Sequence, residues 1–165
     1  ERWKEQFVYS PFNNNNIKKV YHPLTIDDFF PSILELTNSD TKSIIQKVDG
    51  KSFVPLLKNE ISELKPLFWH YPNWWGPSGP GIGSYSAVRK GNWKLIYFHH
   101  NQTIELYNLK EDIFENDNLV TKEPSKSSEL SNLLTDYLIS VDAQMPFNKI
   151  KNSVVPWPNE ISIND

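Results

Sequence analysis

The first clear hydrophobic pattern lies in residues 25–38, where apolar residues recur at the three- and four-residue spacing of an amphipathic helix. Thr25 or Asp27 can cap this helix, and Pro31 falls in its first turn, where a missing N–H costs little. Its apolar positions are Ile26, Phe29, Phe30, Ile33, Leu34 and Leu36. The spacing therefore predicts an N-terminal helix.

A second helical pattern occupies residues 125–145. Ser125 or Ser127 is the expected cap, because a serine hydroxyl can accept from a free backbone N–H of the first turn. The apolar stripe consists of Leu130, Leu133, Leu134, Tyr137, Leu138 and Val141. We expect this stripe to lie on a β-sheet.

Between the two helices, the chain is rich in β-branched and aromatic residues bounded by turn residues. Strands are predicted in residues 65–72, 85–91, 93–99 and 104–109. The buried face of the meander is expected to carry Leu95, Tyr97, Ile104 and Leu106. These elements predict an α+β fold: a small antiparallel β-sheet packed against a C-terminal amphipathic helix, with an N-terminal helix.

Neither end of the chain has a strong pattern. Residues 1–20 are poorly patterned, and we expect the tail of residues 147–165, with two prolines around Trp157, to run extended over the surface. No run approaches the roughly 18 apolar residues of a membrane-spanning helix, so no membrane span is expected.

The composition argues against several classes of function. A net charge of −3 and a pI near 5.8 argue against a nucleic-acid partner. The chain has no cysteine, so it offers no disulfide, no thiolate metal ligand and no cysteine nucleophile. Aromatic residues make up 13% of the chain, and such rings serve either as core or as stacking surface for sugars.

No catalytic or metal-binding motif is complete in this sequence. The four histidines stand in no zinc-like spacing, and the acidic run EDIFENDN lacks the geometry of a calcium loop. The run GPSGPGIG is not a phosphate loop, and no serine lies in a nucleophile elbow. We therefore assign no catalytic residue and no metal ligand to this chain.

The aromatic run FWHYPNWW, residues 68–75, is the remaining candidate. Because side chains alternate along a strand, Phe68 and His70 would share one face, and Trp69 and Tyr71 the other. His70 is then either a hydrogen-bonded neighbour of the core or a side chain facing a cleft at the end of the strand. The sequence alone leaves both readings open.

Five blocks follow one another along the chain: HPLTIDDFFPSILEL, QKVDGKSFVPLLK, KPLFWHYPN, SAVRKGNWKLIYF and IELYNLKEDIFENDNL. In this order they resemble the C-terminal part of the type-I, formylglycine-dependent sulfatases of the alkaline-phosphatase-like superfamily, especially the arylsulfatase and carbohydrate sulfatase paralogues of Bacteroidetes. The resemblance covers about residues 21–145, and its most specific part is LYNLKED with the following Asn-Leu pair, after AVRKGNWKLI.

This resemblance implies a parent enzyme that hydrolyses sulfate esters, on sulfated glycans, with a formylglycine beside a calcium ion. The chain has no Cys/Ser-x-Pro-x-Arg motif, and the family's calcium ligands belong to an N-terminal α/β domain. We therefore expect residues 21–146 to be an excised C-terminal subdomain, inactive alone, whose partners are that N-terminal α/β sulfatase domain and a sulfated carbohydrate. By the same resemblance the protein would be periplasmic or secreted.

The resemblance also implies that this subdomain shapes the substrate pocket. It makes His70, Trp74 and Trp75 the candidate substrate contacts, with the imidazole bonding a sugar oxygen and the indoles stacking on a ring. The alternative is a non-catalytic carbohydrate-binding or interaction module that uses the aromatic residues 68–75. A dedicated sugar-binding module is usually an all-β sandwich, and the two predicted helices argue against it.

Overall fold

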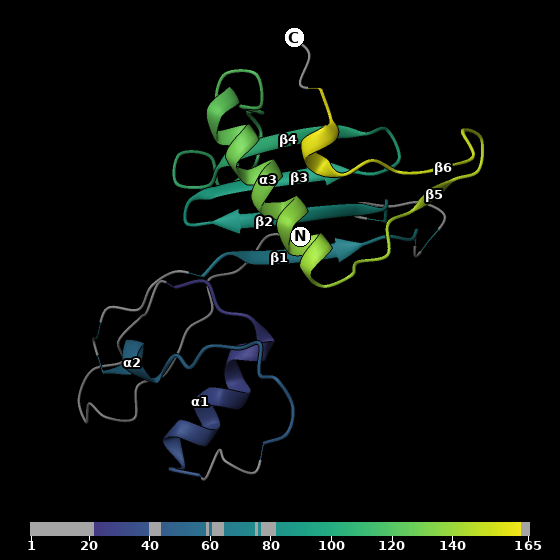
Figure 1. The fold of residues 1–165 in the computed structure, drawn as a ribbon. Coiled ribbons are helices and arrows are strands. Elements are labelled where there is room, and N and C mark those ends of the chain that lie inside the picture. Colours follow the sequence, from purple (N-terminus) through teal and green to yellow (C-terminus); the bar gives the residue numbers. More distant parts are fainter. Residues whose placement is uncertain are drawn as a thin grey trace. The chain divides into compact units, whose positions relative to one another are not determined.

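A computed structural model describes residues 22–39, 44–58, 60, 65–74, 76 and 82–162 of the chain. The predictions made for residues 1–20 lie outside these residues. The described part falls into two compact units, one up to residue 64 and one from residue 65, and each is described by itself (Figure 1). None of the helices found in these residues has the length and apolar content needed to cross a bilayer.

The elements of the first unit are η1 (Ile26–Asp28), α1 (Phe29–Leu36) and α2 (Val54–Leu57). Those of the second unit are β1 (Leu67–Tyr71), β2 (Tyr85–Lys90), β3 (Trp93–Phe98), β4 (Thr103–Asn108), α3 (Pro124–Ser140), β5 (Phe147–Asn148), β6 (Ser153–Val154) and η2 (Pro158–Glu160). Helices and an antiparallel sheet in one chain confirm the predicted α+β class, with its N-terminal and C-terminal helices.

Two buried polar side chains organise the first unit. The Asp28 carboxylate accepts from the backbone N–H of Thr25, at 2.8 Å, and from that of Lys51, also at 2.8 Å. The Ser32 hydroxyl donates to the Asp28 carbonyl and accepts from the backbone N–H of Phe53, at 2.9 Å. These bonds tie the helix to the segment around residues 51–53, and they satisfy groups that would be costly to bury alone.

The apolar stripe of α1 is largely exposed in the described residues. The helix is present as predicted, but its partly exposed side chains include Phe29, Phe30, Ile33 and Leu36. At Gly50 the chain passes so close to the helix start that a Cβ would lie 1.8 Å from the Asp27 carbonyl oxygen. Only glycine fits there without a shift of the backbone.

The second unit is built on a four-stranded antiparallel sheet in the order β1-β2-β3-β4. In its register, Leu95 stands opposite Leu106 and Tyr97 opposite Ile104, which confirms the predicted inner face. The β2–β3 turn lies between Lys90 and Trp93, and Gly91 takes the positive φ of 61° that glycine allows without steric cost.

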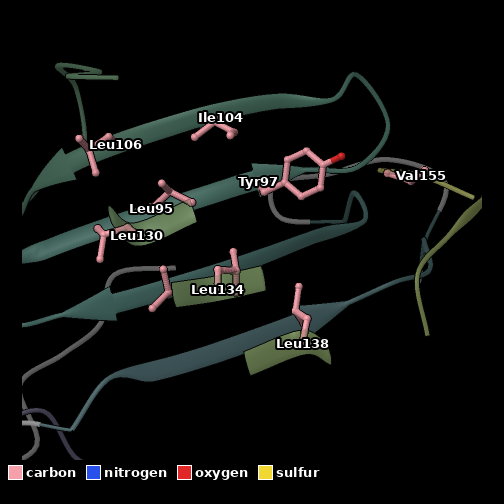
Figure 2. Close-up of a cluster of buried hydrophobic side chains, with 9 residues drawn as sticks. Leu95, Tyr97, Ile104, Leu106, Leu130, Leu134, Leu138 and Val155 are labelled. Carbon is pink, nitrogen blue, oxygen red and sulfur yellow. The ribbon is translucent and has the colours of Figure 1, made fainter. Parts of the chain in front are cut away.

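Helix α3 covers this inner face (Figures 1 and 2). Leu130, Leu134 and Leu138 point from the helix into the cluster of sheet side chains (Figure 2), and all three are fully buried. Tyr137 stacks on Phe68 of β1, with ring centroids 3.8 Å apart. The helix thus lies on the sheet as its sequence pattern predicts, and it contributes a large part of the apolar surface that this unit buries.

Two details of the α3 prediction are wrong. The helix starts after Glu123, with Pro124 in its first turn, because a proline ring presets the helical φ and has no N–H to leave unpaired. Ser127 therefore sits inside the helix, where its hydroxyl donates to the Val120 carbonyl at 2.9 Å. Val141 lies just past the last helical residue and is exposed rather than part of the stripe.

The C-terminal segment does not run extended throughout. Residues 147–154 form the small β5–β6 hairpin, and Val155 enters the core behind it. The Tyr97 hydroxyl donates to the Pro156 carbonyl at 3.0 Å, and Trp157 packs against the same core. The apolar residues between the prolines fold this segment back, because burying them outweighs leaving them in water.

The opposite face of the sheet carries polar contacts. The Lys94 ammonium lies 2.8 Å from both carboxylate oxygens of Glu115, which belongs to the β4–α3 connection. The Tyr107 hydroxyl donates to Glu105 at 2.8 Å, and burial, followed by this carboxylate, raises the pKa of Tyr107. Asp112 in the same connection has a lowered pKa, because backbone N–H groups donate to it.

Candidate functional site

One end of the β1–β4 sheet gathers histidines and aromatic rings. Since β1 and β3 both run antiparallel to β2, their C-terminal ends meet at the same end of the sheet. We call this end the histidine–aromatic edge and define it as His70, Tyr71, Trp74, Tyr85, Ser86, His99 and His100. It is the part of the described chain where candidate ligand-binding side chains converge.

Three side chains of this edge form a continuous hydrogen-bonded chain. His70 Nδ1 lies 2.8 Å from Ser86 Oγ, and Ser86 Oγ lies 2.8 Å from His99 Nε2. At the other side, His70 Nε2 lies 3.0 Å from the carbonyl oxygen of Gln144. The register explains this arrangement, because His70 stands directly opposite Ser86 on the face that α3 covers.

His99 is almost completely buried, with 1% of its surface exposed. Burial, with the charge of His70 as the second cause, lowers the pKa of His99 to about 4. Its imidazole is therefore neutral near pH 7. Its Nδ1 atom is buried and has no hydrogen-bond partner among the described residues.

The other aromatic rings of the edge are more open. Trp74 is 55% exposed, and its ring meets that of His100 edge to face, with centroids 5.6 Å apart. Tyr71 is 47% exposed and lies 5.3 Å from Tyr85, centroid to centroid. Exposed indole and phenol rings held by a neighbouring ring are suited to stacking on the apolar face of a sugar.

The structure brings two of the three predicted contact residues, His70 and Trp74, to the same end of the sheet. Trp75 lies outside the described residues. The contacts of His70 match the reading in which it is a hydrogen-bonded neighbour of the core, and its role toward a substrate stays a prediction.

Sequence reasoning singled out none of four residues of the edge, namely Tyr85, Ser86, His99 and His100. The alternation of side chains along a strand could have placed Ser86 and His99 on the inner face. Ser86 lies opposite Tyr97 on the inner face, and His99 follows Tyr97 by two positions. His100 was missed because it lies in a turn, where alternation predicts nothing.

The described residues do not fit the calcium ion and the formylglycine that the resemblance implies. Within the ranges described above, no three His, Asp or Glu side chains stand close enough to hold a metal ion together. The sequence contains no Cys/Ser-x-Pro-x-Arg motif whose first residue could be converted to formylglycine. No chemical step through either group is therefore assigned to this chain.

Comparison with known proteins identifies the family. The model of the N-sulphoglucosamine sulphohydrolase C-terminal domain matches residues 12–144, most of the chain. The chain belongs to this family. The membership confirms the resemblance to the C-terminal part of sulfatases.

The relatives are longer than this chain. It is 28% identical to a sulfatase of Formosa agariphila, over 94% of the chain and 30% of that protein. It is 25% identical to a protein solved with its substrate D-glucosamine-2-N,6-O-disulfate, with a TM-score of 0.56 over 72% of this chain and 24% of the other. Ps i-CgsB, solved with k-i-k-neocarrahexaose, shares the fold, with a TM-score of 0.60 at 21% identity, over 78% of this chain and 26% of the other.

Proposed function

We propose that the chain is the C-terminal subdomain of a sulfuric ester hydrolase that acts on sulfated glycans. The observation that carries the proposal is the family match over residues 12–144, because that family is the C-terminal part of a sulfohydrolase. The likeness to a protein solved with a disulfated glucosamine supports a sulfated sugar as substrate. We take residues 21–146 as the subdomain.

In this proposal, the histidine–aromatic edge contacts the glycan. Trp74 supplies an exposed ring for stacking, and His70 supplies a ring nitrogen at the half-buried side of the edge. Trp75, next in the chain, is the third proposed contact. The nucleophile and metal ligands come from another part of the protein, since the sequence has no Cys/Ser-x-Pro-x-Arg motif and the described residues hold no group of three possible metal ligands.

That other part is an N-terminal α/β domain with calcium and formylglycine, in a periplasmic or secreted protein. The exposed apolar stripe of α1 supports such a partner domain, because monomeric proteins seldom leave several large apolar side chains of one helix in water. Phe30 and Val48 also line an open hollow beside this helix. A partner covering α1 would fill that hollow.

The test is sulfate release from sulfated saccharides and from an aryl sulfate, by the full-length protein that carries this chain and by the 165-residue chain alone. We expect turnover by the former and none by the latter. Turnover by the 165-residue chain would refute the subdomain assignment. Glycan binding without turnover in the full-length protein would favour the alternative, a non-catalytic carbohydrate-binding module.

The edge is tested in the same full-length protein with Trp74→Ala. Loss of a stacking ring should raise KM for the saccharide about three- to tenfold. Trp74→Phe keeps an aromatic ring and should return KM most of the way to the original value. Ile113→Ala is the matched control, because Ile113 is equally open, at 54% exposed, and follows β4 at the other end of the sheet. Equal KM values in Trp74→Ala and Ile113→Ala would remove the edge from the substrate site.

A further inference from the structure

When both imidazoles are neutral, the hydrogen-bonded chain through His70 fixes where its protons are. A carbonyl oxygen only accepts hydrogen bonds, so the bond to Gln144 requires a proton on His70 Nε2. A neutral imidazole carries one N–H, so His70 Nδ1 is then an acceptor. Among the described residues, its hydrogen-bond partner is the Ser86 hydroxyl, at 2.8 Å, which is therefore the donor.

The same counting continues to the buried end. Once the Ser86 hydroxyl donates to His70, its oxygen is free to accept, and His99 Nε2 is the donor at 2.8 Å. Neutral His99 then has an unprotonated Nδ1, which needs no acceptor, and this atom has no hydrogen-bond partner among the described residues. With both imidazoles neutral, this is the one arrangement that gives each of the three bonds a donor and an acceptor.

We propose that Ser86 and His99 are positioning residues that hold His70 as the Nε2–H tautomer, so that its outer edge offers a hydrogen-bond donor to an acceptor oxygen of the sulfated glycan. That part of the inference rests on the proposed function. The bond between His70 Nε2 and the Gln144 carbonyl lies at the exposed side of the ring. A glycan oxygen therefore either shares the Nε2–H with this carbonyl or takes the place of the carbonyl. The Ser86 and His99 side chains lie behind the ring, buried from solvent.

A catalytic reading of Ser86 fails on the same geometry. A serine between two histidines resembles a nucleophile with its base, but Ser86 has none of its surface exposed. Its proton and its lone pair are both engaged with ring nitrogens. An ester could not reach this oxygen, so its role is to orient the neighbouring ring.

The tautomer is measured directly by nitrogen NMR on the 165-residue chain with ¹⁵N-labelled histidine, at pH 7. Only four histidines need assignment, by His70→Gln and His99→Gln. We expect a protonated Nε2 and a bare Nδ1 in both rings. A protonated Nδ1 on His70 would overturn the positioning role, whatever the protein binds.

The matched variants are Ser86→Ala and Ser84→Ala, which each remove one buried hydroxyl. Ser86→Ala should turn His70 into a mixture of tautomers, whereas Ser84→Ala should leave it unchanged. If Ser86→Ala fails to fold, His99→Phe is the second variant: it removes the donor to the Ser86 oxygen, leaves the Ser86 hydroxyl free to turn away from His70, and should give the same mixture. A pure Nε2–H tautomer in folded Ser86→Ala would refute the inference.

Kinetics in the full-length protein tests the glycan contact. Ser86→Ala should raise KM for the saccharide about fivefold, as loss of one well-formed hydrogen bond does, with kcat nearly unchanged and Ser84→Ala without effect. An unchanged KM together with the expected NMR result would overturn the contact of His70 with the glycan and leave its fixed tautomer established. An unchanged KM in Trp74→Ala as well would refute the proposed substrate site as a whole.

Discussion

Replacement of Leu134 by alanine tests the packing of α3 on the sheet. Leu134 is fully buried and lies in the middle of the helix, against the apolar side chains of the sheet (Figure 2). The change removes three carbon atoms, each worth about 0.8 kcal/mol of transfer free energy. With the cost of the cavity left behind, we expect a loss of about 3 to 4 kcal/mol in the free energy of unfolding.

Ile139→Ala is the matched control. It also removes three carbon atoms from α3, but Ile139 is 55% exposed. Its cost should stay within about 0.5 kcal/mol. Both variants of the 165-residue chain would be unfolded in urea and followed by far-UV circular dichroism and tryptophan fluorescence.

The expected difference in stability between the two variants is large enough to measure as a shift of the urea midpoint. A loss of 3 kcal/mol should lower the urea midpoint of Leu134→Ala by about 1 to 2 M, with an unchanged slope. If Leu134→Ala were no less stable than Ile139→Ala, α3 would not lie on the sheet through this residue. The structure of the second unit would then be wrong.

Three further predictions concern stability under the same assay. Gly50→Ala drives a methyl group into a backbone carbonyl and should cost about 1 to 3 kcal/mol, whereas Gly83→Ala, which meets nothing within 4 Å, should cost little. Because the pKa of His99 falls to about 4 on folding, from its ordinary value of 6.5, the unfolded chain binds more protons between these values. The contribution of His99 to the free energy of unfolding should be fully present above pH 6.5 and decline toward pH 4, by at most about 3 kcal/mol. His99→Gln should abolish this part of the pH dependence. Glu115→Gln leaves Lys94 without its anion and should cost about 1 to 2 kcal/mol, which the double change Lys94→Met with Glu115→Leu should largely recover.

The periodicity of apolar residues predicted the α+β class, because the strongest patterns belong to helices and strands with one buried face. The α3 stripe and the alternation in β3 and β4 are of this kind, and the structure confirms both. The pattern was misleading at the ends of elements. Proline placed the start of α3 earlier than the serine caps suggested, and the tail folded back because Val155 found a place in the core.

The candidate site was harder to predict than the fold. The aromatic run drew attention to His70 and Trp74, but composition cannot say which partners reach a side chain. Ser86 and His99 meet His70 only through the register of three strands. Such contacts are long-range in sequence, and periodicity within a single strand carries no information about them.

The sheet register also determines where the protein can tolerate a change in length. An extra residue inserted into β1 before Trp69 would send every side chain beyond it to the opposite face, so that Trp69 would take the place of His70 opposite Ser86. An extra residue in the β2–β3 turn, between Lys90 and Trp93, leaves the pairing of both strands intact and costs only loop entropy. Peptide tags or reporter segments therefore belong in that turn, far from the histidines. A single-codon insertion in β1 should instead abolish the pairing of His70 with Ser86 while the β2–β3 turn keeps its structure.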